Sequence, residues 1–359
     1  MNSRERVLTS LEGKIPDKIP YLEIRIDNKI IHEYGGPQYT YFDFIEEFDL
    51  DGVVVFPDYD KPGAGWAGWK DSQPGEEDTL IDKWGTVRKK GISEYYADAE
   101  DELAPIKSME DLKTYSPPSL TEENFEPLKT AVKRFKGKKA IILRARDVWS
   151  RPRSLLGYER MLVSTIDNKD LLKKTIDVSN TFNKQAASIA ADLGADAIIT
   201  TDDIADNRSL LISPDSYREI FLPVLEEYVS FCHGLGLKFI KHSDGNIMAI
   251  LEDFINVGID CINPIEPYAG MELPFIKEKY GEKIAIMGNV DCREILPKGD
   301  HQKIEQEVKR AIEEGGPSGF ILSSSNSIHK EIPLSNYMTM ITTWQRQRTV
   351  KATNAVNGN

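Results

Sequence analysis

The chain has 359 residues, a formal net charge of −13 and a sequence pI near 5.1. This acidic balance, without any basic run, argues against nucleic acid as a partner. No apolar stretch is long enough to cross a bilayer, and the first helical pattern, at residues 4–12, follows no signal region. We therefore expect no membrane association and a cytoplasmic location.

Eight short runs rich in β-branched residues follow one another along the chain, most of them separated by helical patterns. Strands that helices bury on both faces have continuous apolar runs of this kind. Alternation of strand and helix predicts a parallel sheet, and eight such units predict a (β/α)8 TIM barrel with an N-terminal helical extension. The predicted strands are residues 20–25, 52–57, 139–144, 195–200, 237–241, 259–263, 283–287 and 319–323.

The extra length of the chain lies mainly between the second and third predicted strands. We interpret residues 60–137 as a lid-like insertion over the barrel mouth, with a hairpin at residues 80–96. Trp66 and Trp84 in this insertion are predicted to stack on a flat substrate, and the alternative is that they simply anchor a loop. One barrel domain is expected over residues 1–350, followed by a disordered tail over 351–359.

Two helix signals help to place the motifs. Residues 167–193 carry apolar side chains at helical spacing, which predicts a long amphipathic helix covering the barrel. Ser213 followed by Pro214 predicts an N-cap and the first turn of another helix. Asp202 and Asp203 are therefore expected in the loop between the fourth strand and that helix.

Nearly every predicted strand is followed by polar or ionisable residues, more than the polarity of loops alone predicts. In a parallel barrel the reacting groups follow the carboxyl ends of the strands. The clearest case is the run Lys-Phe-Ile-Lys-His-Ser-Asp-Gly at 238–245, in which an apolar strand delivers His242 and Asp244 to a loop. The other strand-end groups are Arg25, Asp58, Arg144, Arg146, Asp202, Asp203, Glu266, Asn289, Asp291 and Asn326.

A series of short motifs runs along almost the whole chain. They are RERVLTSLEG at 4–13, PDKIP at 16–20, FPD at 56–58, LISPD at 211–215, HSDG at 242–245, PIEP at 264–267, MGNVD at 287–291 and ILSSSNSIH at 321–329. Together their order and spacing resemble the uroporphyrinogen decarboxylase superfamily, which also contains methyltransferases that depend on cobalamin, a corrinoid. The resemblance implies the same barrel that the strand pattern predicts.

The decarboxylases of this superfamily hold a substrate with many carboxylates. They do so with an arginine-rich stretch after the first strand and an aspartate that binds pyrrole N–H groups. Here the first strand ends with one arginine, Arg25, between two acids, although Asp58 matches the pyrrole-binding aspartate. The family's histidine near the last strand aligns with Asn326. These departures argue against a decarboxylase of uroporphyrinogen itself. Decarboxylation of another tetrapyrrole or another carboxylic acid is kept as an alternative.

The methyltransferases of the superfamily activate a thiol on zinc, which a His-x-Cys pair and a later cysteine hold. His242 matches that histidine, but Asp244 replaces the first cysteine and Asn326 the second. Two interpretations remain: a harder zinc site acting as a Lewis acid, or a metal-free acid/base pair. The candidate metal ligands are His242, Asp244, Glu266, Asp291 and His329.

The predicted function is corrinoid-dependent methyl transfer of the O-demethylase kind, from a methylated substrate, such as a methoxyaromatic compound, to the cobalt(I) corrinoid of a partner protein. The predicted catalytic residues are His242, Asp244 and Asp58. The predicted substrate-binding residues, among them arginines that suit a carboxylate, are Arg25, Arg144, Arg146, Trp66, Trp84, Asp203 and Asn326.

Two further alternatives stay open. One is methyl transfer from methylcobalamin to a thiol or to tetrahydrofolate, and the other is a non-catalytic barrel that binds a small molecule. The three cysteines are far apart, which argues against a disulfide framework. The sequence is compatible with a homodimer.

Overall fold

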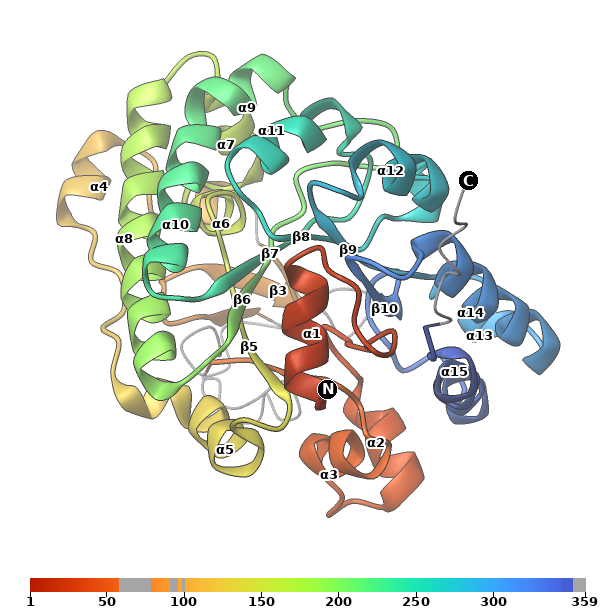
Figure 1. The fold of residues 1–359 in the computed structure, drawn as a ribbon. Coiled ribbons are helices and arrows are strands. Elements are labelled where there is room, and N and C mark those ends of the chain that lie inside the picture. Colours follow the sequence, from red (N-terminus) through yellow and green to blue (C-terminus); the bar gives the residue numbers. More distant parts are fainter. Residues whose placement is uncertain (58–78, 91–95, 99–100, 351–359) are drawn as a thin grey trace. The chain divides into compact units, whose positions relative to one another are not determined.

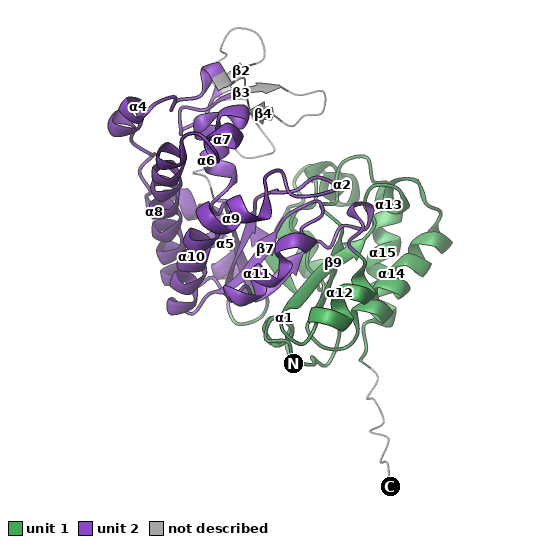
Figure 2. Ribbon diagram, turned by 90° about the horizontal axis from the view of Figure 1, so that it is seen from above, with its two compact units in different colours: residues 1–53, 137–140, 272–359 green, residues 54–136, 141–271 purple. Residues whose placement is uncertain are grey.

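The computed structural model describes residues 1–57, 79–90, 96–98 and 101–350 (Figure 1). The chain divides into two compact units, which Figure 2 distinguishes by colour. Unit 1 consists of residues 1–53, 137–140 and 272–359, and unit 2 of residues 54–136 and 141–271. The predicted disordered tail at 351–359 lies outside the described residues.

Parallel strands and helices alternate in unit 2, as the sequence predicts. The pairs β5–β6, β6–β7 and β7–β8 are all parallel, and nearly every residue of these strands is buried. The strands are β5 (Ala140–Ala145), β6 (Ala197–Thr201), β7 (Lys238–His242) and β8 (Cys261–Asn263), while β1 (Gly52–Val55) crosses the boundary between the units.

The helices of unit 2 begin and end where capping residues allow. Asn168 caps α8 (Lys169–Leu193) through the backbone N–H of Leu171, and Gly194 ends it in the left-handed conformation. Ser213 caps α9 (Pro214–Ile220), as predicted. The other helices are α4 (Met109–Thr114), α5 (Glu126–Phe135), α6 (Ser150–Leu156), α7 (Tyr158–Ser164), α10 (Leu222–Gly234) and α11 (Leu251–Asn256), with short 3-10 turns η3 (Asp101–Leu103), η4 (Glu122–Phe125), η5 (Met248–Ile250) and η6 (Pro267–Ala269).

A small antiparallel sheet lies within the predicted insertion. β2 (Thr79–Ile81) pairs with β3 (Val87–Lys90), and β3 pairs with β4 (Tyr96–Asp98). The turn between β2 and β3 is closed by Asp82, whose side chain accepts hydrogen bonds from the N–H groups of Trp84 and Thr86. The hairpin is thus confirmed, whereas the role of the insertion as a lid stays a prediction.

Unit 1 contains a second parallel pair, β9 (Ala285–Val290) and β10 (Phe320–Ser324). Helix α14 (His301–Gly315) packs on both strands and on α12 (Leu273–Tyr280) and α15 (Leu334–Gln347). The remaining helices are α1 (Ser3–Leu11), α2 (Asn28–Gly35), α3 (Tyr41–Glu47) and α13 (Ile295–Lys298). No helix in the described parts of either unit combines the length and the apolar character needed to cross a membrane.

The predicted first strand, at residues 20–25, does not form a regular strand. Tyr21 and Leu322 make an isolated parallel bridge, and Ile26 and Ile328 make another. Between them the ladder is interrupted because the backbone N–H of Ser324 donates to the buried carboxylate of Glu23, at 2.9 Å. A side chain therefore takes the hydrogen bond that a continuous strand would have supplied.

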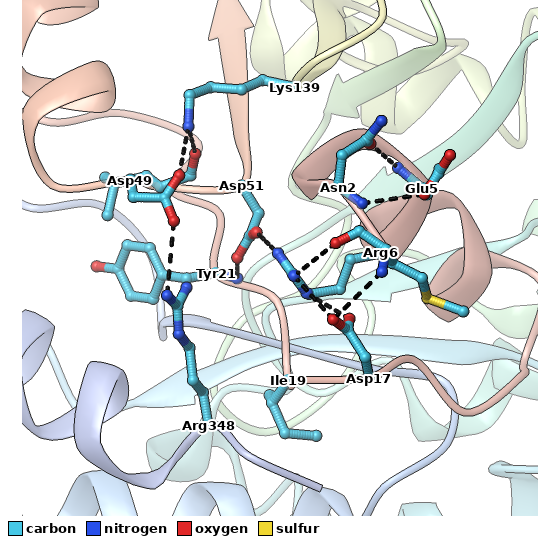
Figure 3. A network of polar contacts seen from close by, with 12 residues as sticks. Asn2, Glu5, Arg6, Asp17, Ile19, Tyr21, Asp49, Asp51, Lys139 and Arg348 are labelled. Carbon is cyan, nitrogen blue, oxygen red and sulfur yellow. Dashed lines mark hydrogen bonds and ion pairs between the residues drawn. The ribbon is translucent and has the colours of Figure 1, made fainter.

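Figure 3 shows how the N-terminal helix is fixed within unit 1. The guanidinium of Arg6 binds Asp17 at 2.8 Å and the fully buried Asp51 at 2.5 Å. The neighbouring Asp49 forms ion pairs with Lys139 at 3.1 Å and with Arg348 at 3.5 Å. The segment just before β1 is therefore tied to residues from both ends of the chain.

Candidate active site

The carboxyl ends of β5 to β8 gather polar side chains within unit 2. The pairing register places His242 of β7 beside Thr201 of β6 and beside Asn263 of β8. β5, β6 and β7 each continue one residue beyond the end that the sequence predicts. Thr201 and His242 therefore belong to the sheet, which holds their side chains more firmly than a loop would.

Three side chains at these strand ends form a group that could hold a metal ion. One ligand atom each from Asp203, His242 and Asp244 lies within 4.8 Å of the others. The Nε2 atom of His242 is 3.5 Å from Oδ1 of Asp203 and 3.5 Å from Oδ1 of Asp244. Two atoms that each bind a tetrahedral zinc ion at ~2.1 Å lie roughly 3.4 Å apart, so this spacing fits zinc.

The imidazole of His242 is oriented by a hydrogen bond on its other nitrogen. Nδ1 lies 2.6 Å from the amide oxygen of Asn263. Burial lowers the pKa of His242, although the nearby carboxylate of Asp203 opposes this shift. The neutral ring is the form that can bind a metal.

Asp244 lies where negative charges accumulate. Burial raises its pKa well above the ordinary value, and the neighbouring charges of Asp203 and Glu266 raise the pKa further. The backbone N–H of Asp244 also donates to Oδ1 of Asp203 at 3.1 Å. This arrangement favours either a proton or a bound cation between the two aspartates.

Glu266 lies close enough to Asp244 for its charge to help raise the pKa of that residue. Its Oε2 accepts a hydrogen bond from the N–H of Gly245 at 2.8 Å, and it is outside the three-residue group. This oxygen holds the backbone that follows Asp244, and the assignment of Glu266 as a metal ligand stays a prediction.

Two predicted arginines lie beside the group. Arg144 donates from Nε to the hydroxyl of Thr201 at 2.9 Å, and its guanidinium stacks on Phe56 at 4.7 Å. Arg146 donates to the backbone oxygen of Thr201. After burial, the positive charges of Lys241 and Arg144 also help to lower the pKa of His242.

Trp84 is packed within the protein. Its side chain is 2% exposed and meets Phe182 edge-on, with the ring centroids 4.5 Å apart. The guanidinium of Arg151 lies 4.0 Å from its ring centroid. These contacts fit the anchoring alternative, so we do not include Trp84 in the proposed site. Asp58 and Trp66 lie outside the described residues.

The predicted site residues of unit 1 have contacts of their own. Oδ1 of Asp291 accepts hydrogen bonds from the N–H groups of Arg293 and Glu294. The Nε2 atom of His329 contacts the backbone oxygen of Cys292 at 2.8 Å, and Nδ1 accepts from Glu331. Neither residue belongs to the three-residue group at the ends of the strands of unit 2, and their assignment as metal ligands stays a prediction. Arg25 pairs with Asp27 at 3.2 Å, and Asn326 is half-buried after β10.

The sequence interpretation missed a buried ion pair next to the candidate site. Lys241, which is 0% exposed, places its ammonium 2.7 Å from Asp147 and 3.0 Å from the backbone oxygen of Asp202. A lysine inside the apolar run 237–241 was the available signal, since an unpaired buried lysine is costly. Asn263, the partner of His242, was missed as well.

Known proteins with related sequences support the predicted family. The model of the uroporphyrinogen decarboxylase (URO-D) family matches residues 100–347. The chain belongs to this family. Its motifs had indicated the same superfamily, and that prediction is confirmed.

Two curated relatives of the chain are methyltransferases. The methylcobamide:CoM methyltransferase MtaA of Methanosarcina barkeri is 25% identical over 187 residues, which is 52% of this chain and 52% of MtaA. MtaA from M. barkeri strain Fusaro / DSM 804 shows the same identity and coverage. The chain therefore spans about half the length of the curated relatives it matches.

A solved structure supports the fold over nearly the whole chain. A methyltransferase from Methanosarcina mazei superposes with a TM-score of 0.75 and 20% identity, covering 96% of this chain and 99% of that one. The comparison shows a shared TIM-barrel-like fold, built here from parallel strands and helices in each unit.

Proposed function

We propose that this protein is a corrinoid-dependent methyltransferase that demethylates a small oxygen-linked methyl donor. The family and the similarity to methylcobamide methyltransferases support the reaction class. The observation that carries the proposal is the spacing of Asp203, His242 and Asp244, which suits a hard cation at the ends of adjacent strands.

The composition of this group disfavours activation of a thiol. Thiolate ligands push charge onto zinc, whereas carboxylates leave it a stronger Lewis acid. All three cysteines of the chain are buried, and none belongs to the group. Cys232 lies in α10, where burial raises the pKa of its thiol to about 12. An acceptor such as coenzyme M would therefore lack the sulfur-rich site that the resemblance implies for it.

Demethylation needs a better leaving group. The methyl–oxygen bond breaks, the methyl group passes to cobalt(I) on the partner corrinoid protein, and the oxygen retains the electron pair and gains a proton. A cation held by Asp203, His242 and Asp244 would stabilise the negative charge developing on that oxygen. Burial and the charges of Asp203 and Glu266 raise the pKa of Asp244, which makes it the candidate general acid when no cation is bound.

The arginines indicate the kind of substrate. Arg144 and Arg146 bring two positive charges to the edge of the sheet that carries the cation group. Guanidinium groups suit carboxylates, and Phe56 offers an aromatic face beside Arg144. A methoxylated aromatic acid combines the carboxylate, the ring and the methyl ether that these residues suit.

The reaction can be tested with purified components. Cobalt(I) corrinoid protein is mixed with a methoxybenzoate, and formation of methylcobalamin is followed by absorbance together with release of the phenol. Asp244→Asn is expected to lower the rate roughly 100-fold or more, the usual effect of losing a general acid. Asp215→Asn, at a carboxylate that is 96% exposed, should retain the wild-type rate. Carbon dioxide release from a tetrapyrrole without methyl transfer would instead favour the decarboxylase.

The metal is tested separately. Protein purified without added zinc is analysed for metal, and stoichiometric zinc that is lost in both His242→Ala and Asp203→Asn supports the Lewis-acid site. A metal-free protein that still demethylates contradicts that site and leaves Asp244 as the acid.

A further inference from the structure

We propose that Asn263 is a positioning residue that fixes the tautomer of His242. Its amide keeps the ring proton on Nδ1, so that the lone pair of Nε2 points toward Asp203 and Asp244. The proposal rests on the cation site described above, but the tautomer itself can be measured without a cation.

The direction of the hydrogen bond follows from the chemistry of the partners. An amide oxygen can only accept, so the 2.6 Å contact between Asn263 Oδ1 and His242 Nδ1 requires a proton on Nδ1. In a neutral imidazole the other nitrogen then has no proton. Nε2 is left with a lone pair, which faces the two carboxylate oxygens at 3.5 Å.

Without the amide the opposite tautomer would be favoured. A carboxylate is a stronger acceptor than an amide oxygen, so a proton on Nε2 would be attracted by Asp203 and Asp244. The observed distances favour the proton on Nδ1. The 2.6 Å between Nδ1 and Asn263 is a short hydrogen bond, whereas the 3.5 Å between Nε2 and Asp203 is too long for one. Asn263 therefore supplies the contact that reserves Nε2 for a cation.

The sheet, rather than a loop, holds Asn263 in place. His242 and Asn263 are register partners on the parallel strands β7 and β8. The backbone oxygen of Asn263 accepts a hydrogen bond from Ser243 at 3.0 Å. Asn263 is 0% exposed, so its amide acts through His242 and does not itself contact the substrate.

The first test measures the tautomer by NMR of protein labelled with 15N-histidine. The chain has five histidines, and the signals of His242 are those lost in His242→Ala. We expect the proton on Nδ1 in the wild type and in Asn263→Asp, which keeps an acceptor. We expect it on Nε2 in Asn263→Leu, which keeps the size but has no acceptor. A wild-type ring with its proton on Nε2 overturns the proposal, as does an unchanged tautomer in Asn263→Leu.

The second test measures affinity for Co2+ by titration of metal-free protein. Losing the partner of a metal-binding histidine typically weakens binding about 10–100-fold, and we expect this for Asn263→Leu but not for Asn263→Asp. Asn183→Leu is the matched control, since its buried amide donates to the backbone of Asp147 and lies outside the cation group.

The outcomes separate the two ideas. Equal affinity in the wild type and Asn263→Leu contradicts the role of Asn263 while leaving the cation site intact. A wild-type protein that takes up no Co2+ contradicts the cation site, and the NMR measurement still decides the tautomer.

Discussion

Lys241 and His242 are neighbours on β7, yet their side chains point to opposite faces of the sheet. Lys241 lies 2.7 Å from Asp147, and the second buried carboxylate on this side, Asp202, pairs with Arg146 at 3.8 Å, so that two positive and two negative charges lie together. His242 is a neutral ring that meets two carboxylates at 3.5 Å. One face of the strand is balanced in charge, and the other has an excess of negative charge.

This difference separates a structural cluster from a binding cluster. On the Lys241 face, Oδ2 of Asp202 also accepts the N–H groups of Asp147, Trp149 and Ser150, each at 3.0 Å, which fixes the start of α6. Such a cluster has little capacity for a ligand. On the His242 face the carboxylates of Asp203 and Asp244 lie close together beside a neutral ring, which favours an added positive charge.

The largest expected effect comes from breaking the balanced face. Lys241→Met leaves Asp147 buried without its partner, and removing one member of a buried pair typically costs about 3–5 kcal/mol. The free energy of unfolding, measured in urea, should fall by this amount. Burial and the charge of Asp202 raise the pKa of Asp147 to about 7 although Lys241 opposes this shift, and removal of Lys241 should raise the pKa further. The loss of stability should therefore grow as the pH rises above about 7, where the variant must still protonate Asp147.

Two variants control this prediction. Lys241→Met combined with Asp147→Asn should be more stable than Lys241→Met alone, since the side chain that loses the ion pair with Lys241 is then uncharged. Lys169→Met removes an ion pair of similar length, 2.6 Å, on the surface, and should cost less than about 1 kcal/mol. If Lys241→Met and Lys169→Met lower the free energy of unfolding equally, the buried ion pair contributes no more to stability than the surface pair.

Glu23 in unit 1 extends the comparison to a charge surrounded by neutral donors. It accepts hydrogen bonds from Tyr21 and from the backbone and hydroxyl of Ser324. Burial outweighs these bonds and raises the pKa of Glu23 from 4.5 to about 7. The folded state therefore binds this proton more tightly than the unfolded state, and stability is lost as the pH rises between these values.

The expected contribution of Glu23 is about 3 kcal/mol across this range of pH. Glu23→Gln stays neutral, so its stability relative to the wild type should improve by this amount from about pH 4.5 to about pH 8. The measurement is urea unfolding at both pH values, with Glu110→Gln, at an exposed carboxylate, as the control. A constant difference between wild type and Glu23→Gln would contradict the raised pKa.

The strands were predictable from the sequence because nearly all residues of the parallel strands are buried, so that each strand is a continuous apolar run. The run at 237–241 corresponds to β7, and that at 319–323 to β10. The ends of the strands were less predictable. His242 is polar, which suggested a loop, but its backbone is still in register with Thr201 of the neighbouring strand. The run at 20–25 failed because a local pattern cannot show that the carboxylate of Glu23 reaches Ser324, 301 positions along the chain.

The candidate site was predictable only where its residues are close in the sequence. His242 and Asp244 stand two positions apart at one strand end, so a single motif contains both. Asp203 and Asn263 reach the same place from neighbouring strands, which requires the strand order and register. Asp203 was consequently assigned to substrate binding, and Asn263 was missed.

The smallest expected effect concerns two glycines that flank β7. Gly236 and Gly245 both have positive φ, +79° and +85°, where any other residue is strained by about 1–2 kcal/mol. A Cβ on Gly236 would meet nothing within 4 Å, but one on Gly245 would lie 2.6 Å from the backbone oxygen of Asp206. Gly245→Ala should therefore cost about 1–3 kcal/mol more than Gly236→Ala, the usual effect of overpacking.

The same pair of variants tests the unbalanced face of β7. Gly245 follows Asp244 directly and is held by Glu266 at 2.8 Å, so relief of the clash must move the carboxylate of Asp244 relative to His242. Affinity for Co2+, measured by titration, should fall in Gly245→Ala and stay at the wild-type value in Gly236→Ala. If both variants bind Co2+ like the wild type, the position of Asp244 does not matter for the cation, and the excess negative charge on this face does not serve cation binding.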